Sequence, residues 1–562
     1  MSILFHAVTN YAIMKFAICL YLFIFSCAAT FAQNKVLSAA SFKHYVDSFN
    51  ANDDELYQQF VPDNQAWTFL ENNIPFFECP DKQMEETYYF RWWTYRKHIK
   101  QTPAGFVISE FLPDVSWAGK YNTISCAAAH HFYEGRWLHD SRFLNDYMHF
   151  WLTDAGDGLR RYSFWSAAAW LAFTSVHNSV ATSQDILSKL EKNYEAWKET
   201  HGEQVHHLYW QVDGADGMEV SVGGQIDNNG IPAHGYKGIR PTINSYIYGD
   251  ARALGTLAHN AGNKQLADRY YAEAAAIKHN VQQTLWSDSM DFFGTIPLDK
   301  NTTGAKPMPV RELIGFVPWY FNLPDDDSTY GRAWLQIKDT SGFNAPFGLT
   351  TCERRHQYFS VSYTEHECQW NGPSWPYATA QTLTAMANVL NNYKHSPITK
   401  KEYLELLSIY TNSHRRTADN GKTVPWIDEN LNPFTGDWIS RTRLANWNGS
   451  PWPKDKGGRE RGKDYNHSTF CDLVISGLIG IRPSTKDALV IHPLVSDGQW
   501  DYFCLDNVLY HGKIITVLFD KTGTKYNHGK GFNILVNGKQ VYHSTHLQKA
   551  EIIINSPANL YT

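Results

Sequence analysis

Apolar residues between about residues 140 and 480 recur mostly at helical spacing. Steps of three or four residues place such side chains on one stripe along a helix. The two clearest stripes consist of Leu266, Tyr270, Ala274, Ile277, Val281 and Leu285, and of Ile186, Leu187, Leu190, Tyr194 and Trp197. Ser183, a residue type favoured at helix N-caps, precedes the second stripe. The same spacing predicts further helices at residues 243–260, 375–391, 401–413 and 468–479.

Beyond Pro483 the pattern changes from helical to extended. Short runs rich in β-branched and aromatic residues lie at positions 489–491, 514–519, 532–536 and 551–554. Asn537-Gly538, directly after one of these runs, is a strong hairpin signal. Residues 484–562 are therefore predicted to form a small β-sandwich module. Nearer the N-terminus, residues 85–100 have a helical pattern and residues 105–111 have the pattern of a strand.

The first 33 residues have the pattern of a secretory leader. Lys15 is followed by an apolar run at residues 16–25 and then by small residues up to Ala32. The apolar run is too short to span a bilayer. We expect residues 1–32 to be a signal peptide, so that the mature protein is secreted or periplasmic. Cys27 leaves a lipoprotein anchor open.

Composition and charge narrow the classes of function. With 562 residues, the chain is long enough for one large domain and a smaller one. The formal net charge of −6 and the lack of a long run of Lys or Arg argue against nucleic acid and anionic membranes as partners. Aromatic residues make up 15% of the chain and often stand beside polar residues, a mixture that suits sugar binding as well as internal packing. No feature indicates a protein partner.

Three segments combine acids with glycines or aromatic residues. In the first, residues 210–224, Asp213, Asp216 and Glu219 stand among four glycines. Glycines allow a tight loop to bring a carboxyl group close to a ligand. An acid-rich turn and a calcium loop are the alternatives. An EF-hand pattern fails because two of the positions that would have to bind the ion lack side-chain oxygens.

The second segment, residues 365–377, contains Trp370, Asn371 and Trp375 at the predicted start of a helix. The two tryptophans are suited to flank a sugar ring, and packing in a buried helix start is the alternative. A metal site is disfavoured, because the His, Cys and two Glu of this segment are adjacent and cannot all face one ion. The six cysteines beyond the leader are scattered without a CxxC pair, so they indicate no disulfide scaffold.

The third segment, residues 424–438, places Glu429 just before a turn signalled by Asn432-Pro433, with Trp426 nearby. A lone Glu in such a place is usually only solvated. When a fold brings two distant carboxyl groups together, however, the pair can catalyse hydrolysis. Glycoside hydrolysis needs one protonated carboxyl group to assist the leaving oxygen and one ionised carboxylate to activate water or attack carbon.

Together the three segments resemble the (α/α)6-barrel hydrolases of glycoside hydrolase family 63 and their mannosylglycerate hydrolase-like and trehalase-like relatives. The resemblance covers residues 140–482. It implies that Glu219, at the end of Asp216-Gly217-Met218-Glu219, is the general acid and that Glu429 is the general base. Because the acid of that family is an Asp, Asp216 and Asp213 remain alternatives to Glu219.

The resemblance also suggests residues that bind the sugar. Residues 371–375 stand in the place of a family element that leads into a barrel helix, and residues 111–121 are the candidate counterpart of an aromatic family segment. The predicted substrate-binding residues are Trp117, Trp370, Asn371, Trp375 and Trp426.

The sequence thus predicts a mainly α-helical protein, an (α/α)6 toroid with a small C-terminal β-sandwich module. Its expected parts are an N-terminal segment that contributes to the barrel at 33–139, the catalytic barrel at 140–483 and the β module at 484–562. The predicted activity is inverting hydrolysis of α-linked oligosaccharides or glycan side chains, without a cofactor or metal. Two alternatives stay open: a lyase or epimerase that uses His366, His467 or Tyr465, and a non-catalytic glycan-binding protein.

Overall fold

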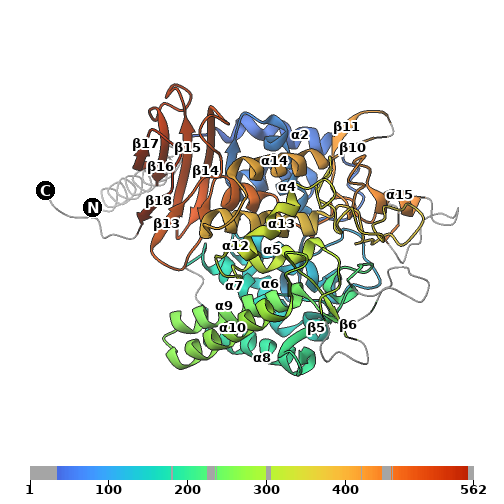
Figure 1. Cartoon of the computed structure of the whole chain (residues 1–562). Coiled ribbons are helices and arrows are strands. Elements are labelled where there is room, and N and C mark those ends of the chain that lie inside the picture. Colours follow the sequence, from blue (N-terminus) through green and yellow to red (C-terminus); the bar gives the residue numbers. More distant parts are fainter. Residues whose placement is uncertain are drawn as a thin grey trace, which may run out of the picture.

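The computed structural model describes residues 35–178, 182–223, 235, 237–298, 306–418, 420–445, 457–458 and 460–554. The predicted leader at residues 1–32 lies outside the described residues. Figure 1 shows a helical body and, at one end of it, a β-rich module formed by the last part of the chain.

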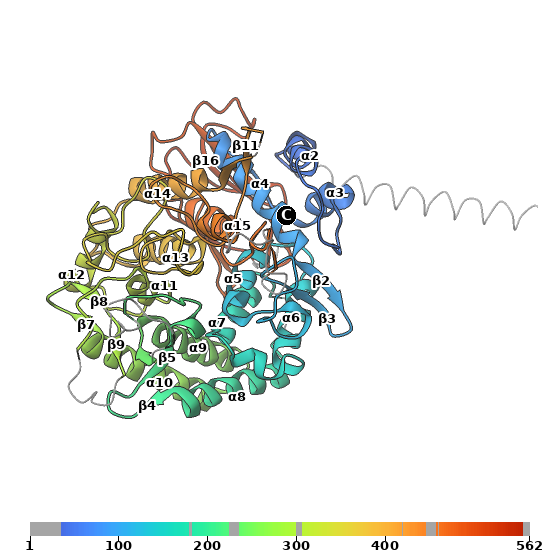
Figure 2. The same ribbon diagram turned by 90° about the vertical axis from the view of Figure 1, so that its right-hand side faces the viewer.

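The helices of the body lie in two layers around a common centre (Figure 2). The inner helices are α5 (Ser125–Gly135), α7 (Ser166–Thr174), α9 (Pro241–Asn260), α11 (Val317–Tyr320), α13 (Pro376–Asn392) and the π-helix η9 (Leu473–Leu478). The outer helices are α4 (Lys82–Lys97), α6 (Arg142–Thr153), α8 (Gln184–His201), α10 (Lys264–Thr284), α12 (Ser328–Gly331) and α14 (Lys400–Ser413). Outer and inner helices alternate along the chain, which is the arrangement of an α/α toroid. The helices α2 (Lys43–Ala51) and α3 (Asp63–Asn73) pack against α4, and α15 (Ile439–Ala445) lies in a later loop.

Amino-acid composition explains which helices are inner. Helix α7 has the sequence Ser-Ala-Ala-Ala-Trp-Leu-Ala-Phe-Thr and is buried on nearly every side, as expected of a helix without a polar face. Helix α10 instead buries one stripe, which includes Tyr270, Ile277 and Val281, as the spacing predicted. The predicted N-cap of α8 is also confirmed, because the Ser183 side chain accepts a hydrogen bond from the backbone N–H of Ile186.

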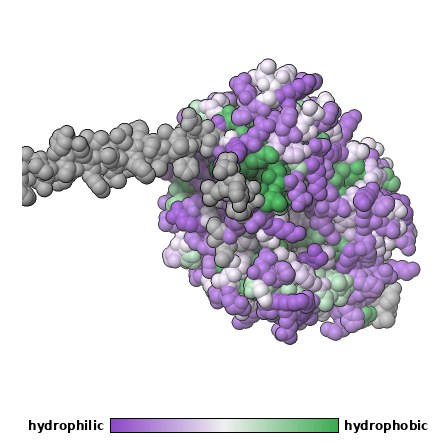
Figure 3. Space-filling model, turned by 90° about the vertical axis from the view of Figure 1, so that its left-hand side faces the viewer, coloured by the Kyte–Doolittle hydropathy of each residue, from purple (hydrophilic) through white to green (hydrophobic). Residues whose placement is uncertain are grey.

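The C-terminal module contains two antiparallel sheets. One has the strand order β12 (Ile481–Arg482), β13 (Ala488–Ile491) and β18 (Ala550–Ile553), and the other has the order β1 (Phe76–Glu78), β14 (Tyr502–Tyr510), β15 (Lys513–Asp520), β16 (Gly531–Val536) and β17 (Lys539–Ser544). Asn537 and Gly538 both have positive φ angles, of 50° and 75°, as a tight hairpin turn requires. The face of the molecule at this module is mostly hydrophilic (Figure 3).

Strand β1 belongs to this module although it comes from the N-terminal part of the chain. Its three residues pair with β14, and Phe76 and Phe77 are fully buried. The sequence pattern predicts that residues 33–139 contribute to the barrel and does not indicate β1, because a strand of three residues has too little periodicity to be recognised.

The two ends of the toroid differ. Loops that precede the inner helices gather at one end, where they are braced by small sheets formed by β2 (Ile99–Thr102) and β3 (Gly105–Ile108), by β4 (Gly202–Glu203), β5 (Leu208–Val212), β6 (Lys237–Ile239) and β9 (Ile296–Pro297), and by β10 (Arg415–Thr417) and β11 (Thr423–Pro425). At the other end, residues in or just after the C-terminal halves of the inner helices, such as Arg136 and Ser476, line a separate cavity. The predicted fold class is confirmed. Within the described ranges, no helix combines the length and the apolarity needed to cross a membrane.

Candidate active site

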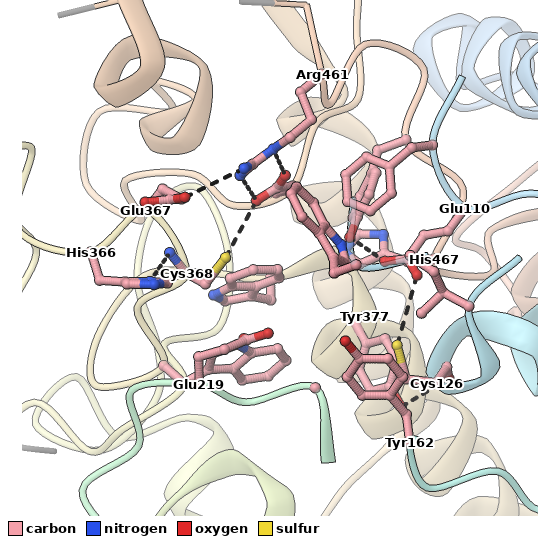
Figure 4. A pocket seen from close by; sticks show the side chains of 18 residues that line it. Glu110, Cys126, Tyr162, Glu219, His366, Glu367, Cys368, Tyr377, Arg461 and His467 are labelled. Carbon is pink, nitrogen blue, oxygen red and sulfur yellow. Dashed lines mark hydrogen bonds and ion pairs between the residues drawn. The ribbon is translucent and has the colours of Figure 1, made fainter. Parts of the chain in front are cut away.

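A cavity of about 230 Å³ lies at the end of the toroid where the inner helices begin. Figure 4 shows it from close by. Loops from distant parts of the chain supply most of its wall, and the first turns of α5 and α13 supply the rest. The described residues that line it are Glu110, Phe111, Trp117, Ile124, Cys126, Tyr162, Gly217, Glu219, His366, Glu367, Cys368, Trp370, Trp375, Tyr377, Glu429, Arg461, Tyr465 and His467.

Glu219 enters the cavity from the segment that connects β5 and β6. This loop turns at Gly217, which has a φ angle of +76° and closes the short helix η4 (Gly214–Asp216). One residue after Glu219, the carbonyl oxygen of Val220 accepts a hydrogen bond of 2.9 Å from the backbone N–H of Trp370. The loop is therefore tied to the tryptophan wall of the cavity. Burial, reinforced by the negative charge of Glu429, raises the pKa of Glu219 to about 8.

Glu429 is in the opposite electrostatic situation. It is 1% exposed, and its two carboxylate oxygens contact the buried guanidinium of Arg461 at Oε1–Nε 2.6 Å and Oε2–Nη2 2.8 Å. Ser440 Oγ donates a further hydrogen bond of 2.9 Å to Oε2. A close cation and a hydrogen-bond donor both favour the charged carboxylate.

The cavity thus contains two carboxyl groups in different electrostatic environments. Burial favours the protonated form of Glu219 by raising its pKa, whereas Glu429 lies against the Arg461 guanidinium. Two carboxyl groups in such different environments are typical of an acid and base pair. In Figure 4, Glu219 and Arg461 lie on different sides of the cavity.

Glu110 is a third carboxyl group in the wall. It follows β3 and is 4% exposed. Its Oε1 accepts a hydrogen bond from the Tyr465 hydroxyl, and Cys126 Sγ lies 3.7 Å from its Oε2. Burial raises the pKa of Glu110 to about 8, and the nearby charges of Glu429 and Glu219 add to the shift. Glu110 therefore also carries a proton at neutral pH.

Aromatic rings form much of the remaining wall. Trp370 and Trp375 stack on each other with ring centroids 4.5 Å apart and an interplanar angle of 16°. Trp375 is held in place by a hydrogen bond of 2.6 Å from its Nε1 to the carbonyl oxygen of Gln369. Trp117 lies at the cavity with the Arg461 guanidinium 5.4 Å from its ring centroid. Such rings can pack against the C–H faces of a sugar.

The two alternative acids of the glycine-rich loop do not line the cavity. Asp216 is fully buried, where it forms an ion pair of 2.8 Å with Arg240 and accepts hydrogen bonds from Ser163 and Thr242. Asp213 is also fully buried, and its Oδ1 accepts hydrogen bonds from two backbone N–H groups. Of the three acids in this loop, Glu219 is the one that faces the cavity.

Two of the predicted sugar-binding residues also lie elsewhere. Asn371 is buried, and its amide donates a hydrogen bond of 3.1 Å to the carbonyl oxygen of Tyr358. Trp426 borders a neighbouring cavity, and the Arg416 guanidinium covers its ring at 4.1 Å from the centroid. Trp117, Trp370 and Trp375 remain as ring candidates at the site.

The described residues contain neither a metal-binding cluster nor a disulfide bond. No cluster of at least three His, Cys, Asp or Glu side chains suited to a metal ion occurs among these residues. The six cysteines of this part are all free, and Cys126 and Cys368 line the cavity.

Comparisons with known proteins identify the family. The family model described as "Mannosylglycerate hydrolase MGH1-like glycoside hydrolase domain" matches residues 120–468, which is more than half of the chain. The chain belongs to the MGH1-like glycoside hydrolases. Residues 481–543 of this glycoside hydrolase match the C-terminal domain of glycosyl hydrolase family 65, in agreement with the β-rich module.

Solved structures add a comparison at the level of the whole chain. A structure described as a sialidase is 42% identical to this glycoside hydrolase over 92% of the chain, with a TM-score of 0.81. The chain spans 44% of the length of that protein. The family 63 mannosylglycerate hydrolase from Thermus thermophilus, in complex with glucose, is 10% identical, with 64% of this chain and 98% of that chain covered and a TM-score of 0.44.

The resemblance inferred from three motifs is confirmed, and so is the enzyme class. The chain contains a glycoside hydrolase domain. The alternatives of a lyase and of a silent binding protein find no support, although His366, His467 and Tyr465 do line the same cavity as Glu219.

Sequence reasoning missed Glu110 and Arg461 as residues of the site. Glu110 is a single charged residue in a loop and Arg461 lies in a loop rich in charged residues, and both patterns usually indicate solvated side chains. A weak signal existed for both. Glu110 directly precedes the aromatic segment at residues 111–121, and Arg461 lies a few residues before the predicted helix at residues 468–479.

Proposed function

We propose that this glycoside hydrolase removes a single uncharged sugar from the end of an α-linked glycan, with Glu219 as general acid and Glu429 as general base. The observation that carries the proposal is the pair of carboxyl groups in one cavity, of which Glu219 has a raised pKa and Glu429 pairs with Arg461. Glu219 donates its proton to the departing glycosidic oxygen, and Glu429 accepts a proton from the attacking water. The aromatic wall formed by Trp370 and Trp375 keeps the site apolar enough for Glu219 to stay protonated.

Removal of one terminal sugar is supported by the size of the cavity. Its volume of about 230 Å³ lies below the roughly 300–1,000 Å³ of pockets that hold larger ligands. A single sugar ring is the glycan unit that suits such a space.

An uncharged sugar is supported by the charges of the wall. Its described residues include four glutamates, and its single arginine, Arg461, already pairs with Glu429 and Glu367. Because that arginine is already shared by two glutamates, a carboxylate on the sugar would find no unshared arginine or lysine among the described residues of the wall. For this reason we propose that sialic acids, to which the name of the 42% identical protein refers, are not substrates of this chain.

Inversion of the anomeric configuration, the α-linkage and secretion are further parts of the proposal. The first two rest on the resemblance to family 63 hydrolases, in which a water molecule stands between the base and the anomeric carbon. Secretion rests on the leader pattern of residues 1–32. Proton NMR in the first minutes of hydrolysis should detect the opposite anomer, whereas retention would refute the single-displacement mechanism.

The test of the two roles uses leaving groups of different quality. A panel of α-linked glucosides, mannosides, galactosides and rhamnosides first identifies a substrate. Glu219→Gln should then lose about 10²- to 10⁴-fold in rate on the glycoside and recover on the corresponding glycosyl fluoride, which leaves with little protonic help. Glu429→Gln should be impaired on both, because water must be activated in either case.

Asp216→Asn is the matched control from the same loop, since Asp216 is buried away from the cavity. It should show no dependence on the leaving group. A dependence in Asp216→Asn together with near-normal rates in Glu219→Gln would refute the assignment of the acid. If both glutamate variants keep full activity, the assignment of the whole site is refuted.

A further inference from the structure

The side chain of Glu110 has one well-bonded oxygen and one weakly bonded oxygen. The Tyr465 hydroxyl donates to Oε1, while Oε2 has the Cys126 thiol at 3.7 Å. A thiol is a weak hydrogen-bond donor. Buried carboxyl oxygens normally have stronger partners than this. Oε2 is therefore able to form a further hydrogen bond with a molecule in the cavity.

The position of Glu110 suits contact with a ligand. Its backbone is fixed, because the Asn466 N–H donates a hydrogen bond of 3.1 Å to the Glu110 carbonyl oxygen. In Figure 4, Glu110 lies on the side of the cavity away from His366 and Glu367, next to His467. A sugar between these walls would be reached by Glu110 from one side and by Glu219 from another.

We propose that Glu110 binds a ring hydroxyl group of the terminal sugar through Oε2 and thereby determines which sugar the cavity accepts. The inference rests on the proposed function, since it places the terminal sugar in this cavity. Glu110 takes no part in the proton transfers assigned to Glu219 and Glu429.

The chemistry of the group agrees with this role. A protonated carboxyl group offers one O–H donor together with acceptor capacity, which matches a sugar hydroxyl group that both donates and accepts. Because Glu110 carries a proton at neutral pH, it can stand near the ionised Glu429 without adding a second negative charge. Glu110 gives the cavity wall a polar group, whereas the tryptophans offer only their ring faces.

A purely structural role is the competing explanation, in which Glu110 only holds Tyr465. Two substitutions keep or remove both contacts of Glu110, and the monodeoxy sugars then separate the roles. Glu110→Gln retains an acceptor for the Tyr465 hydroxyl and an amide that can bond to a sugar, whereas Glu110→Ala removes both. The matched control is Glu85→Ala, because Glu85 is a buried carboxyl group that accepts a hydrogen bond of 2.9 Å from the Tyr45 hydroxyl and does not line the cavity.

The experiment measures sugar binding by calorimetry, without turnover. D-Glucose, D-mannose, D-galactose and L-rhamnose are titrated into the wild type, and the monodeoxy forms of the best ligand follow. Glu110→Ala should weaken the best ligand roughly ten- to hundredfold, as expected for loss of a buried hydrogen bond. Glu110→Gln should recover most of the affinity, and Glu85→Ala should leave it within about twofold of the wild type.

The deoxy sugars supply the decisive comparison. For one monodeoxy sugar, which lacks the hydroxyl that Glu110 contacts, wild type and Glu110→Ala should bind equally, because the two deletions remove the same contact. The proposal would be overturned if Glu110→Ala lost the same affinity for every deoxy sugar, or lost no affinity for the parent sugar. It would also be overturned if no sugar bound to the wild type.

A crystal structure of the wild type soaked with the best ligand covers the case in which Glu110→Ala does not fold. A ring hydroxyl about 3 Å from Oε2 supports the inference, and a ligand that leaves Oε2 without contact refutes it. Hydrolysis is scored separately on the nitrophenyl glycoside of the same sugar. Binding without hydrolysis would refute the proposed function and leave the contact of Glu110 standing.

Discussion

Arg461 is the buried cation on which the charge of Glu429 depends. The two side chains are 2% and 1% exposed, and their closest atoms, Nε and Oε1, are 2.6 Å apart. For charge centres about 4 Å apart and an effective dielectric constant of about 20, the attraction is about 4 kcal/mol. Loss of this attraction removes the main contact that holds the Glu429 carboxylate in the cavity wall.

Replacement of Arg461 by Met should therefore impair Glu429 as the general base, because the carboxylate loses the cation that holds it. The value of kcat should fall by up to about 10²- to 10⁴-fold, the contribution typical of general acid–base catalysis. Arg461→Lys keeps the charge but lacks the planar guanidinium, and it should show a smaller loss. The measurement is kcat on the glycoside that the wild type hydrolyses best.

The matched control lies at the opposite end of the toroid. Arg136 and Asp472 form a buried ion pair of 2.7 Å there, and Arg136→Met should cost about 3–5 kcal/mol of stability without lowering kcat. A wild-type kcat in Arg461→Met would refute the reasoning. An equal loss of kcat in Arg136→Met would refute it too, because the effect would then come from general destabilisation.

Three further results are expected. Turnover should decline as the pH rises through about 8, because Glu219, whose pKa is raised to about 8, loses the proton it must donate; a rate that stays level as the pH rises well above this value would contradict this. Asp216→Ala should lower the free energy of unfolding in urea by about 3–5 kcal/mol, because it leaves the Arg240 guanidinium buried without its carboxylate; a loss under 1 kcal/mol would show that the pair is dispensable. Exhaustive chelation should leave turnover intact, since an acid and base pair of carboxyl groups needs no metal; activity that is lost at once and restored by one added metal would contradict this.

The sequence predicts those features that depend on residues close together in the chain. The stripe that includes Tyr270 and Val281 predicts α10, because helical burial follows a spacing of three to four residues. Asn537-Gly538 predicts a hairpin, because few residue pairs adopt two successive positive φ angles. The glycine-rich loop and Glu429 were found in the same way, from local turn signals and from motif order.

Tertiary structure alone decided which acid faces the cavity and which charges surround it. Asp213, Asp216 and Glu219 lie within seven residues of one another, and only their burial and partners separate them. The hydroxyl that contacts Glu110 comes from a residue 355 positions away, and the cation that holds Glu429 comes from one 32 positions away. Burial and charge act through space, and they shift the pKa of a carboxyl group by way of contacts that no local window of sequence contains.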